Sequence, residues 1–395
     1  MRRYVLVIWL SLAQLCSAQS EWFLENQRAA AEGDADAQHN LGVIYQNGNS
    51  VRKDESEAAK WFRKAADQGF AYAQYDLGFM YMDGTGVPKN GAEAAKWLGK
   101  AANQGYVHAQ HDLGVMYKFG NCVPKDQIEA AKWFRKAADK GDAKAQNHLG
   151  LIYNFGDGVP KDQFEATKWF RKAAIQGNAN AQSNLGNMYN SGGGVPKNET
   201  EAVKWFRKAA DQAHVDAEYN LGVMYANGTG IPKNEFTAVS WYRKAADRGH
   251  AGAQYNLGLM YERGTGVEKD EIEAVKWYRE AADQGVANAQ LNLGNMYVSG
   301  AGVSKNEIEA VRWYRKAAHQ GAAKAQFNLG FMYANGKGVP ANEIEAYKWA
   351  LIAGANGVQE ARAAIPRLEK ILSREQLVSG QAMASEFRPK TESAE

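Results

Sequence analysis

A Leu-Gly pair recurs at a constant spacing of 36 residues through most of this chain. The pair begins at residues 41, 77, 113, 149, 185, 221, 257, 293 and 329, and a tryptophan keeps the same step at residues 61, 97, 133, 169, 205, 241, 277, 313 and 349. A fixed period of this length is typical of a solenoid, in which each unit buries its apolar face only against its neighbours. The chain has 395 residues, more than one compact core usually holds. We therefore predict nine stacked repeats.

Each repeat is predicted to be a hairpin of two helices. In the second repeat the first helix has an apolar face at the i, i+4, i+7 and i+8 spacing, made by Ala73, Leu77, Met80 and Tyr81. Gly84 is predicted to end this helix. A second helix is predicted to begin after Asn90, with a buried stripe of Ala94, Trp97, Ala101 and Ala102.

Repeated and exceptional residues sharpen this expectation. Asp or Asn stands at every N-cap of a second helix, and Glu follows three residues later except at Thr237, which predicts a capping box.

A glycine inside a helix costs about 1 kcal/mol against alanine, so Gly78 and its equivalents predict close approach by a neighbouring backbone. Ser50 and Cys122 replace Gly86, so we expect that position not to require a glycine-only backbone. Ala213 replaces Gly69, which is expected to weaken the loop without shifting the frame.

Residues 1–18 have the layout of a secretory signal peptide. A basic pair, Arg2 and Arg3, precedes an apolar run over residues 4–12, and the small residues Ser17 and Ala18 predict cleavage before Gln19. The run is too short to cross a bilayer, which takes about 20 residues. We expect a secreted or periplasmic protein with no stable membrane insertion.

The composition of the mature chain limits its chemistry. Loss of Arg2 and Arg3 lowers the formal charge from +3 to +1, so we expect no nucleic-acid partner. Loss of Cys16 leaves only Cys122, which excludes an internal disulfide and a cysteine-built zinc site. We predict no cofactor and no metal site.

The order Ala-x3-Leu-Gly-x2-Tyr, Gly-x-Gly-Val and Ala-x2-Trp-x3-Ala-Ala-x2-Gly resembles the Sel1-like repeat. This resemblance implies an all-α fold, a right-handed α/α superhelical solenoid related to the tetratricopeptide solenoid. It also implies an adaptor that holds proteins together, as in eukaryotic ER quality control or among secreted bacterial host-interaction factors. The family has no shared catalytic residues to transfer to this chain.

We predict five segments: a signal peptide (1–18), an N-terminal capping half-repeat (19–36), nine repeats (37–360), C-terminal capping helices (361–388) and a disordered tail (389–395). Residues 22–33 keep Ala29, Ala30 and Gly33 in register but lack the tryptophan at position 25. A tenth copy that begins at Ala361 fails at Ile365-Pro366, and a terminal helix is predicted after Ser373.

The resemblance places the first helix of each hairpin on the concave side of the solenoid. The side chains there that vary from copy to copy are the predicted protein-binding residues: Tyr72, Tyr75, Phe79, His108, His111, Phe119, Phe155, Tyr219, Tyr255, Phe327 and Phe331. Aromatic residues among polar groups are typical of protein-binding surfaces. Drift, together with contacts between adjacent helices, is the alternative reading.

A small polar residue precedes each Leu-Gly pair: Asn40, Asp76, Asp112, His148, Asn184, Asn220, Asn256, Asn292 and Asn328. This row could bind the backbone of a partner or form a ladder along the array. The repetition favours the ladder, because binding rarely needs identical residues in most copies.

Enzyme signals are weak. His108-x2-His111 lacks the His-Glu-x2-His pattern, and Ser50-x2-Lys53 resembles the Ser-x2-Lys of penicillin-reactive enzymes without their Lys-Thr-Gly partner. We predict an exported, non-enzymatic adaptor that binds a protein or peptide. A host-interaction or virulence factor is one such adaptor. The alternatives are a penicillin-binding, β-lactamase-like or other cell-wall enzyme, and a periplasmic envelope-assembly scaffold.

Overall fold

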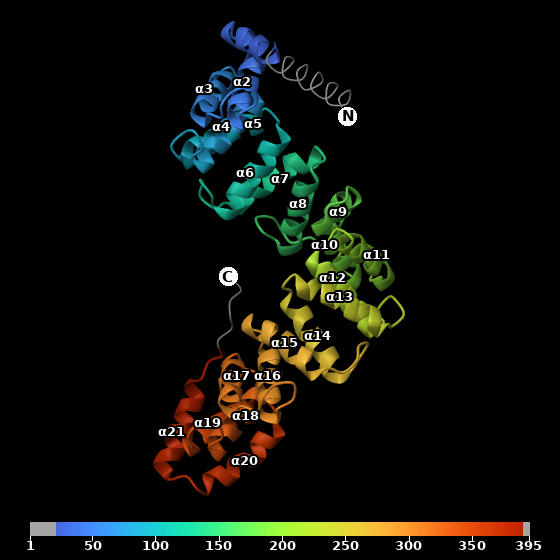
Figure 1. The fold of residues 1–395 in the computed structure, drawn as a ribbon, viewed down its shortest axis with the longest axis vertical. Helices are drawn as coiled ribbons and strands as arrows, with labels where there is room; N and C mark the ends of the chain where they lie inside the picture. Colours follow the sequence, from blue (N-terminus) through green and yellow to red (C-terminus); the bar gives the residue numbers. More distant parts are fainter. Residues whose placement is uncertain (1–20, 390–395) are drawn as a thin grey trace, which may run out of the picture. The chain divides into compact units, whose positions relative to one another are not determined.

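The computed structural model describes residues 21–389 of the chain. The predicted signal peptide and residues 390–395 of the predicted tail lie outside the described residues. All regular structure within 21–389 is helical, which confirms the all-α prediction (Figure 1). The chain divides into two units, residues 1–197 and 198–395, called unit 1 and unit 2.

Unit 1 holds helical residues 21–31, the first four hairpins and the first helix of the fifth repeat. Its labelled helices are α2 (Ala35–Asn47), α3 (Glu55–Asp67), α4 (Ala71–Asp83), α5 (Gly91–Asn103), α6 (Val107–Phe119), α7 (Gln127–Asp139), α8 (Ala143–Phe155), α9 (Gln163–Ile175) and α10 (Ala179–Ser191).

Unit 2 begins with the second helix of the fifth repeat and continues through four hairpins and two further helices. Its helices are α11 (Glu199–Ala210), α12 (Val215–Asn227), α13 (Glu235–Asp247), α14 (Ala251–Arg263), α15 (Glu271–Asp283), α16 (Ala287–Ser299), α17 (Glu307–His319), α18 (Ala323–Asn335), α19 (Glu343–Ala355), α20 (Gln359–Glu369) and α21 (Arg374–Glu386). Helix α20 continues through Pro366, although the repeat motif fails there, and Ser373 caps α21 as predicted. Every helix within 21–389 is too short or too polar to cross a bilayer.

The core of each unit is built between consecutive repeats. One cluster joins alanines and Phe62 of α3, Leu77 and Met80 of α4, and Trp97 of α5, so a tryptophan packs on the preceding repeat. Trp97 is 2% exposed, and the other repeated tryptophans are buried or half-buried. The amine of Lys100 lies 4.0 Å from the centre of the Trp97 ring and covers its outer face. The prediction that the indoles fill the space between helices is confirmed.

All nine predicted N-caps form, because each Asp or Asn side chain accepts a backbone N–H from the first turn of its helix. The capping-box prediction is wrong for the glutamates of these helices. Glu57, for example, pairs with Lys60 at 2.8 Å one turn later, and Glu129 pairs with Lys132 at 2.9 Å. The reciprocal bond of a capping box is made by Gln376 at Ser373.

The mid-helix glycine faces a side chain rather than a neighbouring backbone, which corrects the prediction. A Cβ on Gly114 would lie 2.8 Å from Cδ1 of Phe134, the residue after the repeated tryptophan. Tyr242 occupies the same place below Gly222, where a Cβ would lie 2.5 Å from its ring. The glycine therefore leaves room for a second buried ring in the hairpin.

The loop position of Gly86 is left-handed even where glycine is absent. Ser50 and Cys122 both have φ of 66°, so the position is occupied by residues other than glycine, as expected, but its backbone stays in the left-handed region that favours glycine. Ala213 is also left-handed, at φ 63°, and α11 is one residue shorter than the other second helices. The next helix still begins in register at Val215, as predicted.

A buried glutamine links neighbouring repeats in every first helix from α2 to α18 except α12, which has Glu218 at this position. Gln74 donates through Nε2 to the carbonyl of Ala66, 3.1 Å away in the preceding repeat, and accepts from Gln104 at 2.7 Å. Gln290 makes the same pair of bonds, to Ala282 at 3.0 Å and from Gln320 at 3.0 Å. These bonds fix the spacing of successive hairpins.

Candidate protein-binding surface

The outward side chains of the first helices form the surface that the sequence analysis singled out. We call this surface the first-helix face: in unit 1 it lies on α2, α4, α6, α8 and α10, and in unit 2 on α12, α14, α16 and α18. Side-chain bonds join neighbouring first helices across it. His39 Nε2 lies 2.8 Å from Asp76 Oδ2, and the Tyr75 hydroxyl donates to Asp112 Oδ2 at 2.9 Å.

The polar row before each Leu-Gly pair takes part in these bonds. Asp76 and Asp112 accept from the preceding first helix, and Asn184 donates to Asn147 at 3.0 Å. Asn328 donates to Asn295 at 3.2 Å in the same way. The contacts support the ladder reading of this row at these positions.

Four predicted residues of the second and third repeats, Tyr72, Tyr75, Phe79 and His108, gather with Tyr106 into one aromatic cluster. Tyr72 is 53% exposed, and its ring centre lies 5.0 Å from that of Tyr106. Tyr106 also lies 5.0 Å from Tyr75, which packs 4.8 Å from Phe79. The exposed His108 meets Tyr106 edge-on at 5.5 Å. We call these five side chains the aromatic cluster.

His111 belongs to a separate, more buried group. Its Nδ1 bonds Asp112 at 2.8 Å, and its ring lies 5.6 Å from that of His148, which stacks on Phe134 at 4.7 Å. Burial, with smaller effects from Lys118 and His111, lowers the pKa of His148 to about 4, so its imidazole is neutral at physiological pH. His148 is therefore a packing residue of this face.

Two other predicted residues of unit 1 lie apart from these groups. Phe119 and Phe155 are the last residues of α6 and α8 and are 59% and 67% exposed. The amine of Lys118 lies 5.2 Å from the Phe119 ring centre. Both rings are open to a partner.

The predicted residues of unit 2 are distributed singly. Tyr219 stacks on His250 at 4.3 Å, and Tyr255 lies 6.0 Å from Tyr278. Phe331 is 49% exposed. Phe327 lines a cleft of about 540 Å³ between α16, α18 and the start of α20.

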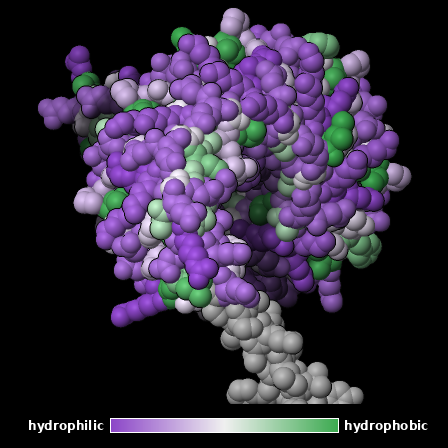
Figure 2. Space-filling model, turned by 90° about the horizontal axis from the view of Figure 1, so that it is seen from above, coloured by the Kyte–Doolittle hydropathy of each residue, from purple (hydrophilic) through white to green (hydrophobic). Residues whose placement is uncertain are grey.

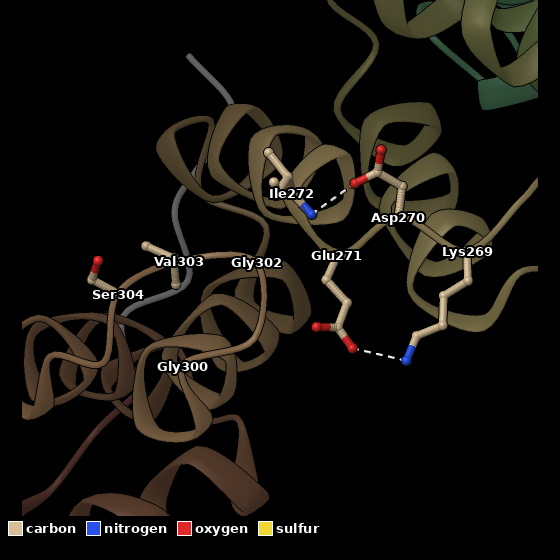
Figure 3. A pocket seen from close by; sticks show the side chains of 8 residues that line it. All are labelled: Lys269, Asp270, Glu271, Ile272, Gly300, Gly302, Val303 and Ser304. Carbon is tan, nitrogen blue, oxygen red and sulfur yellow. Dashed lines mark hydrogen bonds and ion pairs between the residues drawn. The ribbon is translucent and has the colours of Figure 1, made fainter.

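An exposed apolar row that the sequence analysis missed lies at the second position of the second helices. Its members are 57% to 74% exposed: Ile128 and Phe164 in unit 1, and Phe236, Ile272 and Ile308 in unit 2. Figure 2 shows a mainly hydrophilic surface with apolar residues standing out singly. Ile272 also borders a cleft of about 740 Å³ between α15 and loop 300–304 (Figure 3).

The polar groups of this cleft serve local structure. Lys269 pairs with Glu271 at 2.8 Å, and Asp270 accepts the backbone N–H of Ile272 at 2.9 Å (Figure 3). The cleft is the seam between two consecutive repeats.

The residues that resemble catalytic motifs are used in other ways. The amine of Lys53 is 2.7 Å from Glu55, and Ser50 lies in a loop rather than at the start of a helix. His108 and His111 belong to the two different groups described above. Residues 21–389 contain no cluster of three or more His, Cys, Asp or Glu side chains suited to a metal ion.

Comparison with known proteins identifies the repeat. The sequence profile of the Sel1 repeat matches residues 35–70, 71–106, 107–142, 143–178, 179–214, 215–250, 251–286, 287–321 and 323–358. A protective antigen present in uropathogenic Escherichia coli strains, with an SLR fold, is 34% identical; the match covers 92% of this chain and 94% of that one, with a TM-score of 0.55.

A Sel1 repeat protein from Oxalobacter formigenes is also 34% identical, over 78% of this chain and 89% of that one, with a TM-score of 0.61. The search of curated proteins returned no match. The repeat profile spans most of the chain and agrees with the hairpins that the structure shows. The chain therefore belongs to the Sel1 repeat family.

Proposed function

We propose that this protein is an exported scaffold that binds a protein or peptide along its first-helix face. The aromatic cluster is the observation that carries the proposal. Tyr72 is 53% exposed although it packs on Tyr106, so the array keeps a large aromatic surface in contact with water. Exposed aromatic side chains held in place by neighbours are typical of binding hot spots.

The rigidity of the surface also supports binding. Tyr75 is fixed by its bond to Asp112 and by ring contacts on both sides. Burial and the nearby Asp112 carboxylate raise the pKa of Tyr75, so its hydroxyl remains protonated and continues to donate. A partner would therefore meet side chains that are already ordered, which lowers the entropic cost of binding.

Selection of peptides tests the proposal. Random peptides displayed on phage would be selected on the purified chain, and the affinity of the enriched peptides measured by fluorescence anisotropy. We expect Tyr72→Ser to weaken them at least about tenfold, the loss of one hot-spot residue. Phe164→Ser is the matched control, because Phe164 is 67% exposed but lies in the second helix α9. Equal losses in both variants, or no loss in either, would contradict the first-helix face as the binding surface.

Export is a separate part of the proposal and needs its own test. The leader-like residues 1–18 support it, as does the similarity to a protective antigen. On expression of the full chain in a Gram-negative bacterium, we expect the periplasmic or extracellular protein to begin at Gln19. A chain that stays in the cytoplasm with an intact N-terminus would refute export and leave the binding proposal standing.

A further inference from the structure

Carboxylates mark two of the nine positions before Leu-Gly, and both lie beside the aromatic cluster. Asp76 on α4 and Asp112 on α6 stand where the other repeats have Asn or His. Their side chains are 31% and 26% exposed. Asn would be sufficient for the ladder bonds described above, so the negative charge is an addition specific to these two repeats.

The surroundings of these carboxylates are acidic. Asp36 on α2 is exposed and occupies the same position in its repeat as Tyr72 does in the next one. Asp83 is exposed at the end of α4. The histidines that meet the pair are His39 at Asp76 and His111 at Asp112. In unit 1 the lysines on this face are Lys118, at the end of α6, and Lys144, at the start of α8. Burial lowers the pKa of Lys118. The first helices α4 and α6 thus carry three carboxylates and one lysine, whereas α8 carries one lysine and no carboxylate.

The aromatic cluster supplies the other half of a cation site. Tyrosine faces attract guanidinium and ammonium groups, most strongly where a carboxylate lies nearby. Tyr72 and Tyr106 present neighbouring rings at this point, and Asp76 and Asp112 both raise the pKa of Tyr106, after burial as the main cause. Elsewhere the chain itself uses the same chemistry, because the amine of Lys136 lies 3.7 Å from the Trp133 ring centre.

We propose that the first-helix face of α4 and α6 binds a basic peptide segment of its partner. An arginine of that segment lies on Tyr72 and Tyr106 and forms an ion pair with Asp76 or Asp112. This inference rests on the proposed function and adds the chemistry of the partner. In unit 2 the equivalent polar positions are Asn220, Asn256, Asn292 and Asn328, so the row before the Leu-Gly pairs carries no charge there.

A charge-matched peptide pair tests the inference on the full chain. The probe is a fluorescein-labelled peptide of repeated Gly-Ser-Arg, acetylated and amidated, and its control has citrulline in place of each arginine. Citrulline keeps the planar shape but not the charge. We expect the arginine peptide to bind at least about tenfold more tightly, and its affinity to fall as salt is raised from about 0.05 to 0.3 M.

The decisive variant is Asp76→Asn with Asp112→Asn, which installs the residue that most other repeats carry and so keeps the ladder. We expect it to weaken the arginine peptide at least about fivefold and to reduce the salt dependence. Asp67→Asn with Asp139→Asn removes the same charge from exposed positions at the ends of α3 and α7 and should change binding less than about twofold.

Three results would overturn the inference: equal binding of the arginine and citrulline peptides, equal losses in the two Asn variants, or no binding of the arginine peptide. Selected peptides that depend on Tyr72 but carry no basic residue would refute the basic partner while supporting the proposed function. Failure of selected and arginine peptides alike would refute both.

Discussion

At the scale of single residues, two departures from the repeat are each accompanied by a compensating change. Gly86 has no space for a side chain, because a Cβ there would lie 2.1 Å from the carbonyl oxygen of Glu55. In the next repeat Cys122 takes the place of Gly86, and Gly91 takes the place of Glu55. A Cβ on Gly91 would lie 3.0 Å from the Cβ of Cys122. The small residue has moved from one side of the contact to the other.

This exchange predicts coupling between the two positions. We expect Gly91→Ala to destabilise the chain by about 1 kcal/mol through crowding against Cys122. In a Cys122→Gly background the same change should cost less, and Cys122→Gly alone should stabilise by up to about 1 kcal/mol because it removes a left-handed non-glycine residue. Urea unfolding of the four proteins measures the coupling, and strictly additive effects would contradict it.

Glu218 and Arg248 are a second compensating pair. They replace the glutamine pair seen elsewhere, with Arg248 Nε 3.5 Å from Glu218 Oε2. Burial raises the pKa of Glu218 above its ordinary 4.5, and Arg248 partly opposes this. Between the ordinary and the raised pKa, the folded chain binds a proton that the unfolded chain does not. Glu218 therefore contributes stability at pH values below 4.5, which is lost as the pH rises through the folded pKa.

The matching variant is Glu218→Gln with Arg248→Gln, which restores the amide pair found in most other repeats. It should exceed the parent in stability at pH 8 by about 1 kcal/mol, since the amide introduced in place of the Glu218 carboxylate can also donate to the Ala210 carbonyl. The advantage should shrink toward pH 4.5, where the Glu218 carboxyl of the parent gains its proton. Denaturant unfolding at both pH values checks this, and a difference that does not vary with pH would count against it.

At the scale of helices, most hairpins place the mid-helix glycine over an aromatic ring, whereas Gly78 faces Leu98. We expect Gly114→Ala to destabilise by about 2 kcal/mol, because the clash with Phe134 outweighs the gain in helix propensity. The chain offers its own control at Gly330, where Ala350 replaces the ring and the nearest atom to a new Cβ is Trp349 Cβ at 3.2 Å. Gly330→Ala should be close to neutral.

Thermal unfolding of the two variants measures the difference. Equal destabilisation at both positions would show that the ring is not the reason for the glycine.

The helices and caps were predictable from sequence because they depend on local signals repeated nine times. The ring below the glycine was not predicted, although Phe, Leu or Tyr follows the repeated tryptophan in every copy but the last. Adjacent residues on a helix point in different directions. The predicted buried stripe therefore included the tryptophan but not the residue that follows it. The exposed row of Ile and Phe was visible as apolar residues between polar residues, outside that stripe.

The candidate site was predictable only in part. Tyr72, Tyr75 and Phe79 stand out because they vary while their neighbours repeat. Tyr106, which joins them, precedes its helix at a position where other copies have Phe, Asp, Asn, His, Val or Ala. Its membership in the cluster depends on contact between two repeats, which the pattern of a single repeat does not contain. For the same reason the sequence favoured a ladder through Asp76 and Asp112 but did not identify His39 and Tyr75 as their partners.

At the scale of the whole molecule, contacts run mainly between helices adjacent in sequence. A local defect should therefore spread only to nearby repeats. In the Gly114→Ala variant we expect faster amide hydrogen exchange in α6 and α7, a smaller change in α5 and α8, and no change beyond α3 and α9. Hydrogen-exchange mass spectrometry of the intact chain resolves these segments. A uniform rise across unit 1 would show instead that it opens as one block.

The buried glutamine bond also bears on how such an array can grow. Its acceptor in the preceding hairpin is a main-chain carbonyl, as for Gln74 and Ala66, so any copy offers the same atom to whichever copy follows. Gene segments that encode one 36-residue repeat can thus be duplicated or lost without leaving a buried amide without a hydrogen-bond partner. Glu218 and Arg248 are the exception, because recombination that separated them would leave a buried carboxylate without its ion-pair partner. The two residues must therefore be inherited together.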